Sequence, residues 1–159
     1  MPYWLFYMRI LCLDIGSKRI GLAASDPMGW TAQGVGVIQR KGGVEDLDEI
    51  AGRVRELAAE LILVGLPLDE EGRVGEQASK VKRFVERMAS HLGSLDIDIP
   101  IEMWDERYST ATAEQRLIEA DVSRLKRRRV IDKMAAVAIL QDYLDSKAAA
   151  SESGEGFLG

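Results

Sequence analysis

Three short strand segments at the start of the chain, joined by very short connections, constrain the fold more than any other feature. They cover residues 8–15, 19–25 and about 33–39, and the turn signals Gly16-Ser17 and Asp26-Pro27 lie between them. A parallel return between strands requires a crossover of roughly a dozen residues or more. We therefore expect these three strands to run largely antiparallel.

The spacing of the apolar residues then changes from the strand period to the helix period. Apolar stripes predict helices over 44–60 and 76–91, and the continuous apolar run 61–65 between them predicts a strand covered on both faces. The expected stripes are Leu47, Ile50, Val54, Leu57 and Ala58 in the first helix, and Ala78, Val81, Val85 and Met88 in the second.

The order of these elements predicts an α/β fold. A last strand over 99–104 completes a five-stranded mixed sheet, with three antiparallel strands plus two parallel ones. Helices over 111–120 and 124–146 follow, so helices are expected on both faces. We expect a single domain over 1–147 and a disordered tail over 148–159.

The opening segment 1–7 is aromatic and apolar, but it is too short to cross a bilayer and lacks the pattern of a signal peptide. We therefore expect a cytoplasmic protein without a membrane segment. Translation from Met1 and translation from Met8 both fit the sequence.

Cysteine and histidine are too scarce for a zinc site of the usual kind. The chain has one of each, whereas such sites draw most of their ligands from these residues. Any metal must be bound by oxygen ligands, which favours Mg²⁺ or Mn²⁺. The formal net charge of −5 argues against a protein that is basic overall, but positions 124–129 hold five cations and form a local basic cluster.

Carboxylates follow the first and the last of the predicted strands. Asp14 comes after four consecutive apolar residues, and Asp105 and Glu106 follow the strand over 99–104. Ligands of open α/β sheets bind beyond the carboxyl ends of the strands, so we expect these acids at one edge. Side-chain alternation lets only one of Asp105 and Glu106 point inward, and the sequence leaves open which one does. An ion pair with Lys18 or Arg19 is the structural alternative for Asp14.

Asp132 lies on the apolar stripe of the last predicted helix and should therefore face the sheet. It could form a buried ion pair with Arg128 or Arg129, or it could join Asp14 in an acidic cluster. Such a cluster can hold two divalent ions roughly 4 Å apart, which activate water and stabilise the leaving oxygen in phosphodiester hydrolysis. The stripe in question consists of Ala135, Ala136, Ile139, Leu140 and Tyr143.

Four sequence blocks carry a resemblance to a known family. They are LDIGSKRIGLAASDP at 13–27, VGLPLD at 64–69, WDERYST at 104–110 and VIDKMAAVAILQDYL at 130–144. In these blocks the chain resembles the YqgF family, also called RuvX, whose members are similar to RuvC-type Holliday junction resolvases. The resemblance spans about residues 9–145, and four blocks in the same order make it specific. It implies an RNase H-like fold.

The resemblance also implies an activity. It indicates a metal-dependent endonuclease that hydrolyses phosphodiester bonds with Mg²⁺ or Mn²⁺, in maturation of the 5′ end of pre-16S rRNA. It assigns catalysis and metal binding to Asp14, Asp105, Glu106 and Asp132. The expected partner is nucleic acid, with the protein as a monomer or homodimer. The expected nucleic-acid contacts are Lys18, Arg19, Arg107, Arg124, Lys126, Arg127, Arg128 and Arg129; neutralisation of the acids is the alternative role for the first three.

Three alternatives to this function remain at this point. A Holliday junction resolvase acting on branched DNA differs only in substrate. An actin-like ATPase or sugar kinase shares the Asp-x-Gly-Ser pattern, but 159 residues are too few for its two domains. The retained acids weigh against a non-catalytic nucleic-acid-binding RNase H-like module. Among the remaining residues, Gly65 and Gly75 are expected to serve loop geometry, and Trp104 to belong to the core.

Overall fold

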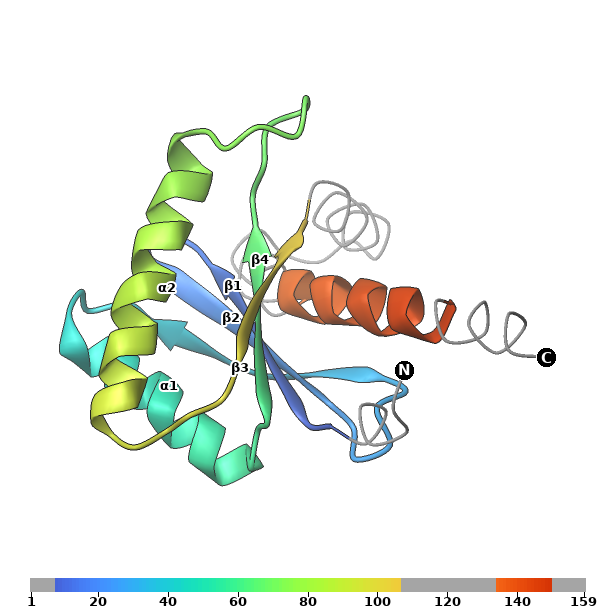
Figure 1. The fold of residues 1–159 in the computed structure, drawn as a ribbon, viewed down its shortest axis with the longest axis horizontal. Helices are drawn as coiled ribbons and strands as arrows, with labels where there is room; N and C mark the ends of the chain where they lie inside the picture. Colours follow the sequence, from blue (N-terminus) through green and yellow to red (C-terminus); the bar gives the residue numbers. More distant parts are fainter. Residues whose placement is uncertain (1–7, 107–133, 150–159) are drawn as a thin grey trace, which may run out of the picture.

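The computed structural model describes residues 8–106 and 134–149, and the following account is confined to them. Five strands form one sheet, with helices α1 and α2 on one face and a helix over 134–149 on the other (Figure 1). The elements are β1 (Ile10–Ile15), β2 (Arg19–Ser25), β3 (Ala32–Gln39), α1 (Val44–Leu57), β4 (Leu61–Leu66), α2 (Glu76–Ser94) and β5 (Ile101–Asp105).

The sheet has the mixed topology expected from the sequence. Its strand order is β3-β2-β1-β4-β5. The β1–β2 and β2–β3 pairs are antiparallel, and β4 runs parallel to both β1 and β5. Three antiparallel strands plus two parallel ones are thereby confirmed. The parallel strands β1, β4 and β5 all end at the same edge of the sheet, where ligands of such folds bind.

Alternation along β1 divides the core into two clusters. Leu11 and Leu13 point into the larger cluster, beneath α1 and α2, whereas Ile10 and Cys12 point into the smaller one, beneath the helix over 134–149. The fully buried Ile139 and Leu140 of that helix supply its share of the second cluster. Asp14 follows Cys12 by two residues, so its side chain belongs to the second face.

The predicted helices are correct in kind and differ in detail. The first ends at Leu57 rather than at residue 60, because Ala58 adopts a left-handed conformation with φ 50° and is exposed, not part of the stripe. In α2, Phe84 is 3 % exposed while Val85 is only half-buried, so the buried stripe passes through Phe84. Phe84 and Val85 are neighbours in sequence, and an apolar pattern alone does not rank them.

The C-terminal helix continues through residue 149 in the part of the chain that the structure describes, three residues beyond its predicted end. Residues 150–159 of the expected tail lie outside the described residues. Within residues 8–106 and 134–149, no helix is long and apolar enough to cross a membrane.

Candidate active site

The candidate site lies where β1, β4 and β5 end beneath the helix over 134–149. Asp14 is the fifth residue of β1 and is half-buried, directly beyond the fully buried Cys12 on the same face. The register pairs Leu13 with Val64, which places Gly65 of β4 alongside Asp14 at this edge. Strand pairing thus fixes the position of the Asp14 carboxylate.

Gly65 provides the space for a second carboxylate. A Cβ atom added to Gly65 would lie 2.2 Å from Glu106 Oε2 and 2.7 Å from Ile139 Cδ1. Any side chain at this position would therefore collide with the Glu106 carboxylate or with the helix above it. The expectation that Gly65 serves loop geometry is wrong: Gly65 lies within β4, without a left-handed backbone, and its role is to leave room.

The structure distinguishes between Asp105 and Glu106. Gly65 pairs with Trp104 and Leu66 with Asp105, so Trp104 and Glu106 project to the Gly65 face and Asp105 projects to the other. The backbone N–H of Glu106 donates to Leu66 O at 3.3 Å, which carries the pairing one residue beyond the strand. Of the two acids, Glu106 is the one whose side chain meets Asp14.

Contacts between β5 and the helix over 134–149 hold this face together. Trp104 Nε1 donates to Asp142 Oδ2 at 2.8 Å, and the Tyr143 hydroxyl donates to Glu102 Oε2 at 2.9 Å. The rings of Trp104 and Tyr143 meet edge to face, with centroids 5.2 Å apart. Trp104 is a packing residue, as predicted. The network positions the helix so that Ile139 reaches Gly65 and Glu106.

Two carboxyl groups in contact raise the proton affinity of the site. Burial raises the pKa of Glu106 to about 8, and the negative charge of Asp14, a hydrogen bond to Asp14 and the charge of Asp105 add to the effect. Burial also raises the pKa of the Cys12 thiol well above its usual range, with contributions from Asp14 and Glu106. The negative potential therefore extends into the core beneath the two acids.

One oxygen of this pair lacks a hydrogen-bond partner in the described part of the chain. Glu106 Oε2 is buried and has no hydrogen-bond partner among residues 8–106 and 134–149. A buried, unpaired carboxylate oxygen is costly, and a cation is the group that such an oxygen suits. The same described residues contain no group of three or more His, Cys, Asp or Glu side chains that could hold a metal ion, so they supply two acids and not a complete ligand set.

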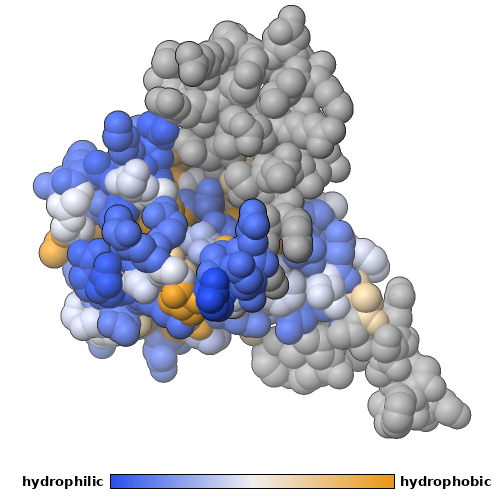
Figure 2. Space-filling view, turned by 90° about the horizontal axis from the view of Figure 1, so that it is seen from above, coloured by the Kyte–Doolittle hydropathy of each residue, from blue (hydrophilic) through white to orange (hydrophobic). Residues whose placement is uncertain are grey.

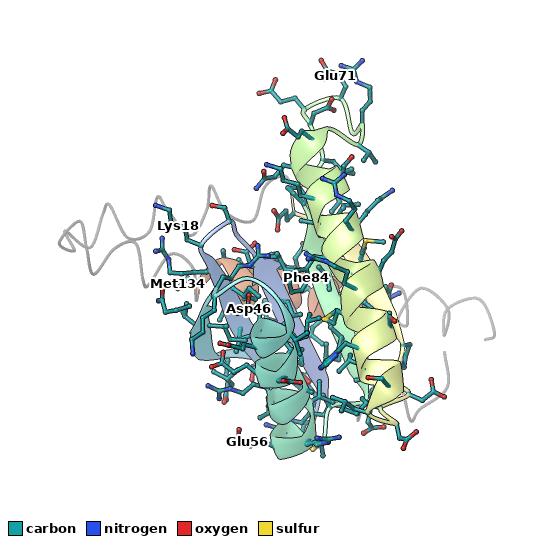
Figure 3. The ribbon with its side chains drawn as sticks, turned by 90° about the vertical axis from the view of Figure 1, so that its left-hand side faces the viewer. Lys18, Asp46, Glu56, Glu71, Phe84 and Met134 are labelled. Atoms are coloured by element: carbon teal, nitrogen blue, oxygen red, sulfur yellow. The ribbon has the colours of Figure 1, made fainter. Side chains whose placement is uncertain are left out.

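The remaining predicted site residues have different outcomes. Lys18 is exposed on the turn after β1, and Arg19 is half-buried at the start of β2 (Figure 3 labels Lys18). The predicted catalytic acid Asp132 lies outside the described residues, and so do the predicted nucleic-acid contacts Arg107, Arg124, Lys126, Arg127, Arg128 and Arg129.

Solved structures of low sequence identity share this fold. RuvC of Thermus thermophilus, solved in complex with a Holliday junction substrate, matches with a TM-score of 0.53 and 14% identity over 89% of this chain and 96% of that one. The fowlpox virus Holliday junction resolvase matches with a TM-score of 0.52 and 13% identity over 87% and 99%. The fold is thus RNase H-like, as expected.

Sequence relatives are much closer. A protein of Desulforamulus reducens is 53% identical over 89% of this chain and 99% of its own length, and one of Clostridium novyi is 50% identical over 87% and 99%. Both carry the name "Putative pre-16S rRNA nuclease". The family model RuvX, described as Holliday junction resolvase, matches residues 8–146. With nearly its whole length matched, the chain belongs to the RuvX family.

Proposed function

We propose that this protein is a metal-dependent endonuclease that hydrolyses phosphodiester bonds at the edge formed by β1, β4 and β5. The observation that carries the proposal is the contact between the Asp14 and Glu106 carboxyl groups, with Glu106 Oε2 buried and unpaired in the described part of the chain. Repulsion between two crowded acids opposes folding, and groups with pKa values perturbed in this way cluster at functional sites.

Asp14 and Glu106 would hold Mg²⁺ or Mn²⁺, with Asp132 as a further ligand. The support for Asp132 comes from the helix over 134–149, since Ala136, Ile139 and Tyr143 are all buried against the face that carries Asp14. In the sequence Asp132 precedes Ala136 by four residues, which is the spacing of one helical stripe. Asp105 contributes negative potential to Glu106 rather than a ligand.

Divalent ions bound by these acids supply Lewis-acid stabilisation of the charge that develops on the phosphate. The protein's own contribution is positioning. Gly65 leaves room for Glu106, Cys12 and Ile139 exclude water beneath the acids, and the sheet fixes Asp14. With Glu106 protonated near neutral pH, the site in its metal-free form avoids full charge repulsion.

The proposed substrate is the 5′ end of pre-16S rRNA. Relatives that are about 50% identical over nearly their whole length carry the name of a pre-16S rRNA nuclease. A cytoplasmic location and nucleic acid as the partner follow from that substrate. The family description favours branched DNA as the second candidate. A dimer would support the second candidate, since two symmetric cuts need two sites.

The test is cleavage in Mn²⁺ of a pre-16S rRNA fragment and of a four-way DNA junction, with wild type, Asp14→Asn, Glu106→Gln and Asp132→Asn. We expect each acid variant to lose at least about 100-fold in rate on the preferred substrate, the scale of removing one charge-stabilising group. Glu49→Gln, on the exposed side of α1, is the matched control and should retain full activity. Full activity of the Asp14 and Glu106 variants on both substrates would refute the proposal.

A further inference from the structure

A basic hollow lies on the face of the sheet opposite the acidic pair. It has a volume of about 590 Å³ and lies between α2 and the turn that follows β1. Its walls carry four cations against a single carboxylate, that of Glu86. The four cations are Arg40, Lys80, Arg83 and Arg87.

The ring of Phe84 packs against the guanidinium groups of Arg40 and Arg87. The guanidinium carbons of Arg40 and Arg87 lie 5.1 Å and 5.7 Å from the centroid of its ring. Arg40 also donates to Gly16 O at 2.8 Å, and its Nε lies 3.8 Å from Asp46 Oδ2. Stacking of this kind reduces the freedom of a guanidinium group before any ligand binds. Figure 3 looks onto this side and labels Phe84 and Asp46.

Not all of the positive charge in the hollow is already neutralised. Arg40 is paired with Asp46, and Lys80 has an exposed ion pair with Glu76 at 3.6 Å, a contact of little strength in water. Arg83 and Arg87 are exposed, and neither has an ion pair within the ranges that the structure describes. These two arginines are therefore available to an anion from outside.

The hollow borders the end of the strand that carries Asp14. One wall is formed by Ile15, Gly16 and Ser17, the three residues directly after Asp14. Asp14 and Ile15 point to opposite faces of the sheet, so the Gly16-Ser17 turn lies next to both the acidic pair and the hollow. Figure 2 looks onto the molecule from above, and the described surface in this view is mostly hydrophilic.

We propose that this basic hollow binds backbone phosphates of the nucleic-acid strand on one side of the scissile bond, as the strand crosses the Gly16-Ser17 turn. The inference rests on the proposed nuclease function and extends it, since it assigns a strand-binding role to α2. Arg83 and Arg87 contact the phosphates, and Arg40 with Phe84 positions them. Such contacts fix the position of a strand without reading its bases.

The experiment measures binding of a fluorescein-labelled 20-nucleotide single-stranded RNA in EDTA, across a range of salt concentrations. EDTA removes the divalent ions, so binding is measured separately from cleavage. The variants are Arg83→Gln/Arg87→Gln, and the control is Arg55→Gln/Lys82→Gln, which removes the same charge from positions outside the hollow. Uridine 5′-monophosphate is titrated in parallel as a probe for a small-anion site.

We expect the Arg83→Gln/Arg87→Gln variant to bind the RNA about tenfold or more weakly near 0.1 M salt. Its slope of log K against log salt should be shallower by about 1.4, from two lost phosphate contacts. The control variant should change the slope by much less. Equal losses in both double variants, or no loss in either, would overturn the proposal.

Tight binding of the mononucleotide, abolished by the same two substitutions, would also overturn it, in favour of a small-anion site. A cleavage assay on the same variants distinguishes failure of the strand-binding role from failure of the proposed nuclease function. If wild type cleaves and the arginine variants bind normally, only the strand-binding role fails. If wild type binds through these arginines but does not cleave, the nuclease proposal fails instead.

Discussion

Replacing Glu106 by Gln should stabilise the metal-free protein at high pH and lose that benefit at low pH. The folded pKa of Glu106 is raised from 4.5 to about 8 by burial and by Asp14. A carboxyl with a raised folded pKa favours folding while it is protonated. Its contribution is fully present below about pH 4.5 and is lost as the pH rises through 8. Glutamine carries no charge, so its contribution to stability does not change between pH 4.5 and pH 8.

The size of the effect follows from the same two values. A difference of about 3.5 between them corresponds to about 5 kcal/mol at a single site. Glu106 is only half-buried, so solvent reduces this figure, and we expect the variant to gain about 2–4 kcal/mol in unfolding free energy at pH 9. Near pH 4.5 the variant should be close to wild type in stability, because glutamine is uncharged like the protonated carboxyl and its amide N–H can donate to Asp14 in the same way.

Urea unfolding in EDTA at pH 4.5, 7 and 9 measures this difference, with Glu49→Gln as the exposed control. The control should stay within about 0.5 kcal/mol of wild type at every pH. A gain for Glu106→Gln that is the same at pH 4.5 and pH 9 would refute the reasoning. So would a loss of stability at pH 9, because the site would then depend on the charged carboxylate for folding.

Two further predictions test the candidate site, and a third tests the loop before α1. Gly65→Ala should lose about 1–3 kcal/mol in unfolding free energy and most of the cleavage activity, since its Cβ would lie 2.2 Å from Glu106 Oε2. Gly52→Ala is the control: a Cβ there would meet no atom within 4 Å, so this variant should gain about 0.5–1 kcal/mol in unfolding free energy. Asp105→Asn should retain far more cleavage than Glu106→Gln in the same Mn²⁺ assay, and equal losses would contradict the parity argument. Asp46→Ala should lose about 2–3 kcal/mol in unfolding free energy, measured in urea. Asp46 is buried and accepts hydrogen bonds from the backbone N–H groups of Lys41 and Gly42, at 2.9 and 3.0 Å. An unchanged stability would show that water replaces these bonds.

The sheet could be predicted because each strand carries its own evidence in the sequence. Connections too short for a crossover required β1, β2 and β3 to be antiparallel, and the apolar run of β4 required cover on both faces. The helix ends were harder to predict from the sequence. Ala58 continues an apolar stripe and favours helix, yet it adopts a left-handed conformation that ends α1. The helix end is closed there by local backbone bonds, from Ala58 N–H to Arg55 O and from Ala59 N–H to Val54 O, which an apolar stripe does not predict.

The sequence predicted that carboxylates meet at the candidate site, but not which of Asp105 and Glu106 meets Asp14. A carboxylate at the end of a buried strand marks Asp14, but the choice between Asp105 and Glu106 needed the register with Gly65. The role of Gly65 was missed because only three-dimensional structure shows which atoms would fill a missing side chain. The hollow over Phe84 was missed for a similar reason, since its cations come from β3's end and from α2, far apart in the chain.

Mn²⁺ binding followed by titration calorimetry at pH 7, in buffers of different ionisation enthalpy, tests the central claim most directly. Because the pKa of Glu106 is about 8 without metal, wild type should release about one proton per site on binding. Glu106→Gln and Asp14→Asn should bind at least about tenfold more weakly, and the Glu106 variant should release no proton. Equal Mn²⁺ affinity in all three proteins, or binding to wild type without proton release, would contradict the assignment of these two carboxylates to a shared cation site.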